Sequence, residues 1–195
     1  MRYDAEHKAR TRQKILSEAA LAIRRDGPEA VGVAGIMAAA GLTHGGFYAH
    51  FSSKEALFAA AIDEMFMEAL LRLETATQEC SARVGLGRFI DYYLSAAHRD
   101  VRGQGCPVPA LMADLARLGG PARERFTQGI TNLTGRLAGL LGALGQAEPE
   151  AQAVSLMAEL VGALGLSRAV ADTAWSDTIL ADSRRLLKQR LGLDA

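Results

Sequence analysis

Residues 33–55 read Val-Ala-Gly-Ile-Met-Ala-Ala-Ala-Gly-Leu-Thr-His-Gly-Gly-Phe-Tyr-Ala-His-Phe-Ser-Ser-Lys-Glu. Alanine and long apolar residues favour a short helix over 33–40, and Gly41 suits the left-handed position that ends a helix. Thr43 is a residue type that opens helices, so a second short helix is predicted from there to about Phe51. Two short helices joined by a glycine turn form a helix-turn-helix, whose second helix can enter the major groove of DNA.

The second short helix is predicted to have an apolar and a polar face. Phe47 and Phe51 are four residues apart and share one face, and His44 and Tyr48 share another. The two faces lie about 100° apart, as the 3.6-residue helical turn requires. We therefore expect both phenylalanines in the core and His44 and Tyr48 turned outward.

Two adjacent glycines stand at the start of the same helix. Gly45 and Gly46 each cost about 1 kcal/mol relative to alanine in a helix, so the pair makes sense if something bulky approaches the backbone there. A DNA edge is such a partner. Thr43 and Lys54 flank the segment with a hydroxyl and an ammonium group, which suit phosphate oxygens.

Helical periodicity continues through the rest of the chain. The first stripe consists of Ile15, Leu16, Ala19, Ala20 and Ile23. Ser52 and Glu55 have capping-box spacing and open a long connecting helix that ends near Cys80. Further helices are predicted over about 83–101, 110–118, 122–145, 147–171 and 175–191. Because no segment alternates as a strand does, the predicted fold class is all-α.

Composition is that of an ordinary globular protein. The 195 residues include 22 Lys+Arg and 22 Asp+Glu, and 49% of them are hydrophobic. The uncharged run 137–147 is too short to cross a membrane, which takes about 20 residues, and no apolar signal-peptide core is present. Cys80 and Cys106 form no disulfide framework. We expect a soluble, cytoplasmic protein that does not enter membranes.

Charge is distributed unevenly. Residues 1–60 carry 8 Lys+Arg against 6 Asp+Glu, whereas residues 61–195 carry 14 against 16. Five of the basic residues fall within the first fourteen positions. A basic arm before an apolar helix suits a polyanion, although a solvated helix face explains the same pattern.

Signatures of catalysis are missing from the sequence. No Gly-Lys dipeptide of a phosphate-binding loop, no His-Glu-x-x-His and no Gly-x-Ser-x-Gly occurs. None of the four histidines is spaced with carboxylates as metal ligands are. We expect neither an enzyme nor a protein with a metal or another cofactor.

The segment 33–55 resembles the DNA-binding signature of the TetR family of transcriptional regulators. The resemblance is carried by Ala-Gly-Leu-Thr-His-Gly-Gly-Phe-Tyr-Ala-His-Phe at 40–51 and Ser-Lys-Glu at 53–55. It implies a three-helix DNA-binding head over 1–60 and a ligand-binding and dimerisation body over 61–195. It also implies a homodimer that binds a palindromic operator and represses transcription until a small ligand arrives.

The resemblance assigns DNA contacts position by position. Thr43, Tyr48 and Lys54 fall where the family contacts phosphates, His44, Gly45 and Gly46 fall where bases are approached, and His50 closes the recognition helix. Arg10 and Arg12 of the basic arm are expected to face phosphates as well. His50 and Tyr48 have packing roles between helices as their structural alternatives.

The body offers large side chains for a ligand cavity beneath the connecting helix. The candidates are Met65, Phe66, Phe89, Tyr92, Tyr93, Met112, Phe126 and Trp175, and they favour an apolar or aromatic effector, although such residues are usually core. Dimerisation is predicted on the last two helices. Their small residues Ala158, Gly162, Gly165 and Ala169 allow close approach, with Leu156, Leu160, Leu164 and Leu187 as bulk.

Cys106 is a candidate redox thiol. It lies in Gly103-Gln-Gly-Cys-Pro-Val-Pro, ahead of a predicted helix, with Arg99 and Arg102 nearby in sequence. A helix start and basic neighbours lower a thiol pKa, which would make the sulfur reactive towards electrophiles and oxidants. The alternative is a small buried hydrophobe, the role expected for Cys80.

Two other functions remain open at this point. The first is an activator of transcription with the same fold. The second is a helical enzyme or scaffold that has lost DNA binding.

Overall fold

The computed structural model describes residues 2–115 and 120–193, and every regular element in these ranges is a helix. The all-α prediction is therefore confirmed. The elements in chain order are α1 (Arg2–Asp26), α2 (Val33–Ala39), the 3-10 turn η1 (His44–Ala49), α3 (Lys54–Thr77), α4 (Ala82–Tyr93), α5 (Ala96–Asp100), the 3-10 turn η2 (Arg102–Gln104), α6 (Pro107–Leu115), α7 (Gly120–Ala143), α8 (Pro149–Ala169) and α9 (Thr173–Arg190).

A glycine ends each of the first two helices, as predicted for Gly41. Gly27 follows α1 with a φ of 84°, and its N–H donates to the Ile23 carbonyl. Gly41 follows α2 with a φ of 69°, and its N–H donates to the Ala38 carbonyl. Only glycine adopts this backbone at no steric cost. The following segment, expected to be a helix to about Phe51, is the tighter η1 turn, which suits two adjacent residues of low helix propensity.

One predicted helix start and one predicted helix differ in the structure. Ser53, not Ser52, caps α3 by accepting a hydrogen bond from the Ala56 N–H at 3.1 Å. The helix expected over 83–101 is two helices, α4 and α5. Ser95 separates them, because its hydroxyl donates to the Tyr92 carbonyl and accepts from the N–H of residue 98, which starts a new helix.

The remaining boundaries move by a few residues. α6 starts at Pro107, three residues earlier than expected, because the fixed φ of proline suits the first helical turn. α9 starts at Thr173, where Asp172 caps it by accepting from the Trp175 N–H at 2.9 Å. The predicted helix end at Leu118 lies outside the described residues.

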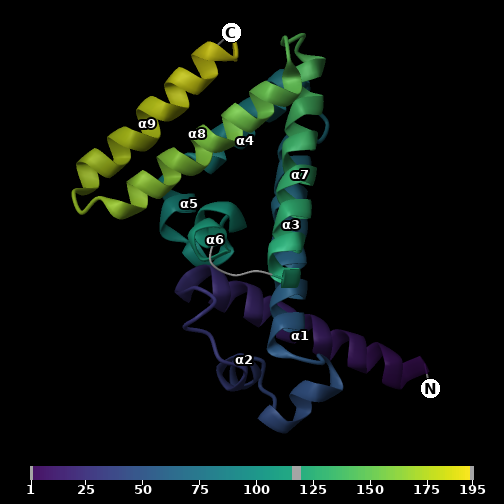
Figure 1. Cartoon of the computed structure of the whole chain (residues 1–195). Helices are drawn as coiled ribbons and strands as arrows, with labels where there is room; N and C mark the ends of the chain where they lie inside the picture. The colour runs from purple at the N-terminus through teal and green to yellow at the C-terminus, as the bar shows by residue number, and fades with distance from the viewer. Residues whose placement is uncertain (1, 116–119, 194–195) are drawn as a thin grey trace.

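α3 connects the two parts of the molecule. It crosses the expected boundary at residue 60 without a break and runs alongside α7, while α8 and α9 form a second pair of helices (Figure 1). A side chain at Gly129 on α7 would place its Cβ 2.2 Å from the Phe66 ring on α3. The absence of a side chain therefore allows α7 to approach α3 closely.

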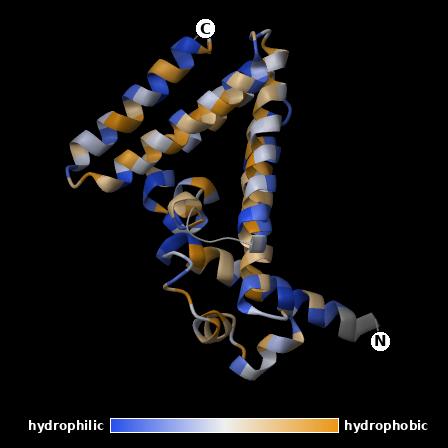
Figure 2. Cartoon of the chain, in the orientation of Figure 1, coloured by the Kyte–Doolittle hydropathy of each residue, from blue (hydrophilic) through white to orange (hydrophobic). Residues whose placement is uncertain are grey.

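Hydrophilic residues interrupt the apolar ones along every long helix, as Figure 2 shows clearly for α8 and α9. Within the described ranges, none of the helices is both long and apolar enough to span a membrane.

We expect Gly129→Ala to destabilise the protein by about 1–3 kcal/mol, because a methyl group there overpacks the contact with Phe66. Gly139→Ala on the same helix is the matched control, since its Cβ would meet nothing within 4 Å. This variant should gain about 0.5–1 kcal/mol from helix propensity. Urea unfolding followed by circular dichroism measures both, and equal stabilities would contradict the α3–α7 packing.

Candidate DNA-binding surface and ligand site

The η1 turn exposes one face and buries the other. Phe47 and Phe51 are only 1% and 5% exposed, and their rings stack at 5.9 Å. Tyr48 is 72% exposed and His44 is exposed as well. The prediction that the phenylalanines anchor the turn while His44 and Tyr48 face outward is confirmed.

Nothing inside the chain requires glycine at positions 45 and 46. Neither residue has a positive φ. A Cβ on Gly45 would meet nothing within 4 Å, and one on Gly46 would lie 3.8 Å from the Met37 and Thr43 side chains, an ordinary contact. Neither backbone conformation nor packing within the described residues therefore requires glycine at these two positions.

Cations surround the exposed turn. Arg10 and Arg12 are exposed on α1, and the Arg12 guanidinium lies 4.8 Å from the centre of the Phe51 ring. The Lys54 ammonium lies 4.9 Å from the centre of the Phe58 ring. These cation–π contacts hold two positive charges close to η1. The exposed Thr43 precedes η1, and its hydroxyl makes no capping bond and is free for another partner.

His50 closes the turn and is half-buried. Its Nδ1 atom is buried and has no hydrogen-bond partner. Burial lowers the pKa of His50, and the nearby charges of Lys8 and Arg12 lower it further. Half-burial of an uncharged ring is compatible with the structural alternative expected for His50, packing between helices.

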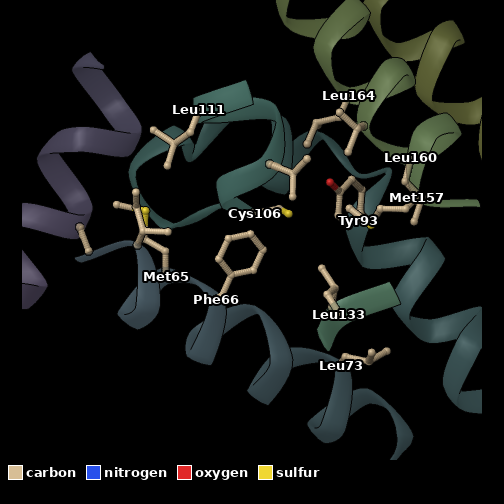
Figure 3. Close-up of a cluster of buried hydrophobic side chains, with 14 of the residues drawn as sticks. Met65, Phe66, Leu73, Tyr93, Cys106, Leu111, Leu133, Met157, Leu160 and Leu164 are labelled. Carbon is tan, nitrogen blue, oxygen red and sulfur yellow. The ribbon is translucent and has the colours of Figure 1, made fainter. Parts of the chain in front are cut away.

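The predicted cavity residues do not form one cavity. Phe89, Tyr92 and Tyr93 surround an inner crevice of about 10 Å³, too small for a molecule larger than water. The others lie elsewhere: Met112 and Phe126 line an open groove of about 490 Å³, Met65 and Phe66 are buried in the core, and Trp175 is 59% exposed. The candidates therefore do not line one common cavity, and core side chains gather beside α3 (Figure 3).

An outer groove of about 390 Å³ lies beside the inner crevice. It is lined by Leu71, Arg72, Thr75, Ala76, Phe89 and Tyr92. Three of these, Arg72, Phe89 and Tyr92, also line the inner crevice. The two spaces are therefore neighbours that share a wall.

The prediction of a lowered pKa for Cys106 is wrong. The thiol precedes α6, and the Val108 N–H does act to lower its pKa, as does Tyr93. Burial acts more strongly in the opposite direction, since Cys106 is only 6% exposed, and the pKa is raised. Arg99, expected to help, instead pairs with Asp100 and Asp177 at 2.7 and 2.6 Å.

His98 is a buried residue that sequence reasoning missed. Its Nδ1–H donates to the Tyr93 carbonyl at 2.8 Å, and its Nε2 accepts from the Cys106 N–H at 2.9 Å. Because one ring nitrogen donates and the other accepts, the ring is neutral. Burial lowers its pKa to about 4. The ring thus ties the α4–α5 turn to the loop before α6.

A partly buried ion pair joins α1 to α3. Arg24 at the end of α1 pairs with Glu68 of α3 at 2.6 Å and lies 3.4 Å from the Gly105 carbonyl. Glu68 also lies 3.9 Å from Arg72. Residues on helices this far apart in sequence carry no local signal of pairing, so the periodicity of the chain does not reveal them.

α2 and the exposed η1 turn form a helix-turn-helix, an arrangement that DNA-binding regulators of transcription use. The tetR family of bacterial regulatory proteins matches residues 15–61, which contain α2, η1 and the start of α3. Residues 15–61 are therefore similar to the DNA-binding segment of this family, as the resemblance of residues 33–55 implied.

Known proteins of this kind are similar along different parts of the chain. The uncharacterized HTH-type transcriptional regulator YfiR of Bacillus subtilis (strain 168) is 29% identical over 103 residues. That match covers 53% of this chain and spans only half, 50%, of YfiR.

Solved structures share the fold over nearly the whole chain. A TetR transcriptional regulator from Chloroflexus aurantiacus J-10-FL has a TM-score of 0.82 at 24% identity, covering 96% of both chains. A TetR family regulator from Cytophaga hutchinsonii has a TM-score of 0.80 at 21% identity, covering 94% of this chain and 96% of that one. E. coli NemR in its reduced form has a TM-score of 0.77 at 22% identity, covering 92% and 95%.

We expect His98 to make stability depend on pH between about 7 and 5. As the pH falls, the unfolded chain binds a proton at this residue near pH 6.5, whereas the folded chain binds it only near pH 4. The free energy of unfolding should therefore fall by about 2 kcal/mol over this range from His98 alone. Urea titrations of wild type and His98→Gln at both pH values measure it. A variant that loses stability as steeply as wild type would show that His98 is not held neutral.

Proposed function

We propose that this protein is a transcriptional repressor that binds operator DNA as a homodimer and leaves it when a small molecule binds the body. The glycine pair in the exposed η1 turn carries the proposal. Gly45 and Gly46 have no purpose inside the chain, and a duplex edge that meets their backbone supplies one.

The DNA contacts follow from exposure and charge. Tyr48 and Thr43 are exposed beside the glycines and offer hydroxyls to phosphates. Lys54 offers a positive charge once its ammonium group leaves the Phe58 ring. Arg10 and Arg12 extend this positive edge along α1. His44 is the one long polar side chain of η1 that reaches towards bases, and Gly45 and Gly46 let it approach.

In this proposal two copies of the chain form the DNA-binding homodimer by packing α8 and α9 against each other. Ala158 and Gly162 lie on the exposed face of α8, and a Cβ on Gly162 or Gly165 would meet nothing within 4 Å. Exposed apolar residues lie on the same two helices, namely Val154, Leu166, Trp175 and Leu186. Small residues between apolar ones suit close helix packing in an isologous four-helix bundle.

The leucines that were expected to supply bulk at this interface are instead buried inside the single chain. Leu156, Leu160, Leu164 and Leu187 are each 0% exposed and belong to the core of the single chain. The exposed apolar residues of α8 and α9 take over the proposed role.

The signal in this proposal is a non-covalent ligand. A buried thiol with a raised pKa is a poor nucleophile at neutral pH, which argues against Cys106 as a sensor of electrophiles or oxidants. A ligand that binds better when the body is rearranged would move α3, and with it the head. A promoter–reporter assay separates repression from activation.

We expect Gly45→Ala to weaken operator binding by roughly tenfold, because a methyl group stands where the DNA approaches, while leaving protein stability unchanged or higher. Tyr48→Phe and Lys54→Ala should weaken binding to all sequences alike, and His44→Ala should change the sequence preference. Binding should fall steeply with salt, and two recognition turns should reach major grooves about 34–36 Å apart.

Electrophoretic mobility shifts with genomic fragments and fluorescence anisotropy at several salt concentrations measure these effects. Gly139→Ala is the control, since it makes the same chemical change on α7 in open space. Full operator affinity in Gly45→Ala would contradict close approach at η1, and salt-independent binding would contradict the phosphate contacts.

We expect Gly162→Arg to convert the dimer into a folded monomer, because the side chain projects from the exposed face of α8 without a clash inside the chain. Gly135→Arg on α7 is the matched control, with equally open space around its Cβ. Sedimentation equilibrium gives the mass, and circular dichroism verifies the fold. A dimeric Gly162→Arg protein would place the interface elsewhere.

A further inference from the structure

Buried hydrogen-bond donors without strong acceptors gather at one place in the body. The Tyr93 hydroxyl, in a residue that is only 2% exposed, has no partner except the Cys106 sulfur, a weak acceptor, and the Nη1 atom of Arg72 is buried and has none. Both side chains line the inner crevice. In Figure 3 the hydroxyl end of Tyr93 faces Cys106. Buried donors are nearly always satisfied in native proteins, so two of them at one crevice indicate a missing acceptor.

Charge at the same place is unbalanced. Arg24 and Arg72 share a single carboxylate, that of Glu68, at 2.6 and 3.9 Å. The nearer arginine is Arg24, whose side chain is 2% exposed and whose Nε atom is a further buried donor without a partner. Arg72 is the one charged residue that lines the crevice among those described, since His98 is neutral there. Among Arg24, Arg72 and Glu68 one positive charge is left over, and a monoanion at Arg72 would neutralise it.

Access to the crevice lies through the outer groove. Arg72, Phe89 and Tyr92 form the wall between the two spaces. Tyr92 is 39% exposed, and its ring is held by stacking on the His98 ring at 5.1 Å with an interplanar angle of 18°. A rotation of this partly exposed ring would join the groove of about 390 Å³ to the crevice.

We propose that the body binds a planar aromatic carboxylate across this wall. Its carboxylate accepts hydrogen bonds from Arg72 Nη1 and the Tyr93 hydroxyl, and its ring lies between Phe89 and Tyr92. The inference rests on the proposed function, whose effector it identifies by chemical class.

The ring, the carboxylate and the single negative charge of the proposed ligand each follow from the residues of the site. The apolar walls of the outer groove suit a ring, and the flat Tyr92–His98 stack shows that the site accommodates parallel planes. A carboxylate accepts from a guanidinium and a hydroxyl at once. A cation is excluded by Arg72, and a dianion is disfavoured because Glu68 lies close to the same arginine.

The test compares carboxylates with neutral amides of the same shape on the full-length protein. Benzoate and 2-naphthoate are titrated against benzamide and 2-naphthamide by isothermal calorimetry. At least one carboxylate should bind roughly tenfold more tightly than its amide. Arg72→Gln should abolish this preference, and Arg72→Lys should retain most of it because the charge remains. Arg136→Gln, an exposed arginine on α7, should leave it unchanged.

Tyr93→Phe is a second variant, and it tests the ligand contact without weakening the fold. Removing a buried hydroxyl whose only partner is a weak sulfur acceptor should change the melting temperature little, and it should reduce the carboxylate preference severalfold. Loss of preference together with retained stability assigns the hydroxyl to the ligand.

The place of binding is measured at Cys106, which borders the crevice. In a Cys80→Ser background, 2-naphthoate should slow alkylation of Cys106 by iodoacetamide, and 2-naphthamide should not at the same concentration. Equal binding of acids and amides, binding that survives in Arg72→Gln, or no binding of either acid at millimolar concentration would overturn the proposal.

Operator binding is measured in parallel on the same protein. A protein that binds and leaves DNA but shows no carboxylate preference refutes the ligand class alone. A protein that prefers carboxylates but binds no genomic fragment refutes the proposed repressor function alone.

Discussion

The ion pair between Arg24 and Glu68 is the constraint on which the arrangement of head and body depends. A guanidinium that is 2% exposed is stable only when it is paired, so the end of α1 must stay 2.6 Å from α3. The same guanidinium lies 3.4 Å from the Gly105 carbonyl, in the loop that leads to α6. One buried charge therefore fixes three segments, and one of them belongs to the DNA-binding head.

The head and the proposed ligand site share this pair. Glu68 faces Arg24 on one side and Arg72 on the other, and Arg72 lines the inner crevice. An anion at Arg72 would compete with Glu68 for the guanidinium and alter the balance that holds α1. Because α3 runs unbroken from Lys54 to Thr77, a shift at residue 72 reaches the head through a rigid helix. This gives the proposed coupling a physical route, in which a ligand favours one of two positions of α3.

Surroundings, more than sequence position, decide the chemistry of the titratable groups. Cys106 stands before a helix, where its thiolate is favoured, yet burial outweighs that effect and raises its pKa. His98 follows the same rule, because burial lowers its pKa to about 4 and holds it as a neutral bridge between Tyr93 and Cys106. Both groups are structural at neutral pH in this state.

The sequence by itself determined the helical class, the helix-turn-helix and its two faces. These features depend on residues that are close in sequence. Gly27 and Gly41 end helices, and Phe47 and Phe51 share a face because they are four residues apart. Only the tertiary structure decided which side of α8 is core, because its leucines and its small residues are both regularly spaced and either face could have turned inward. It also decided the burial of Cys106 and the pairing of Arg24 with Glu68, since these depend on contacts between residues far apart in the chain.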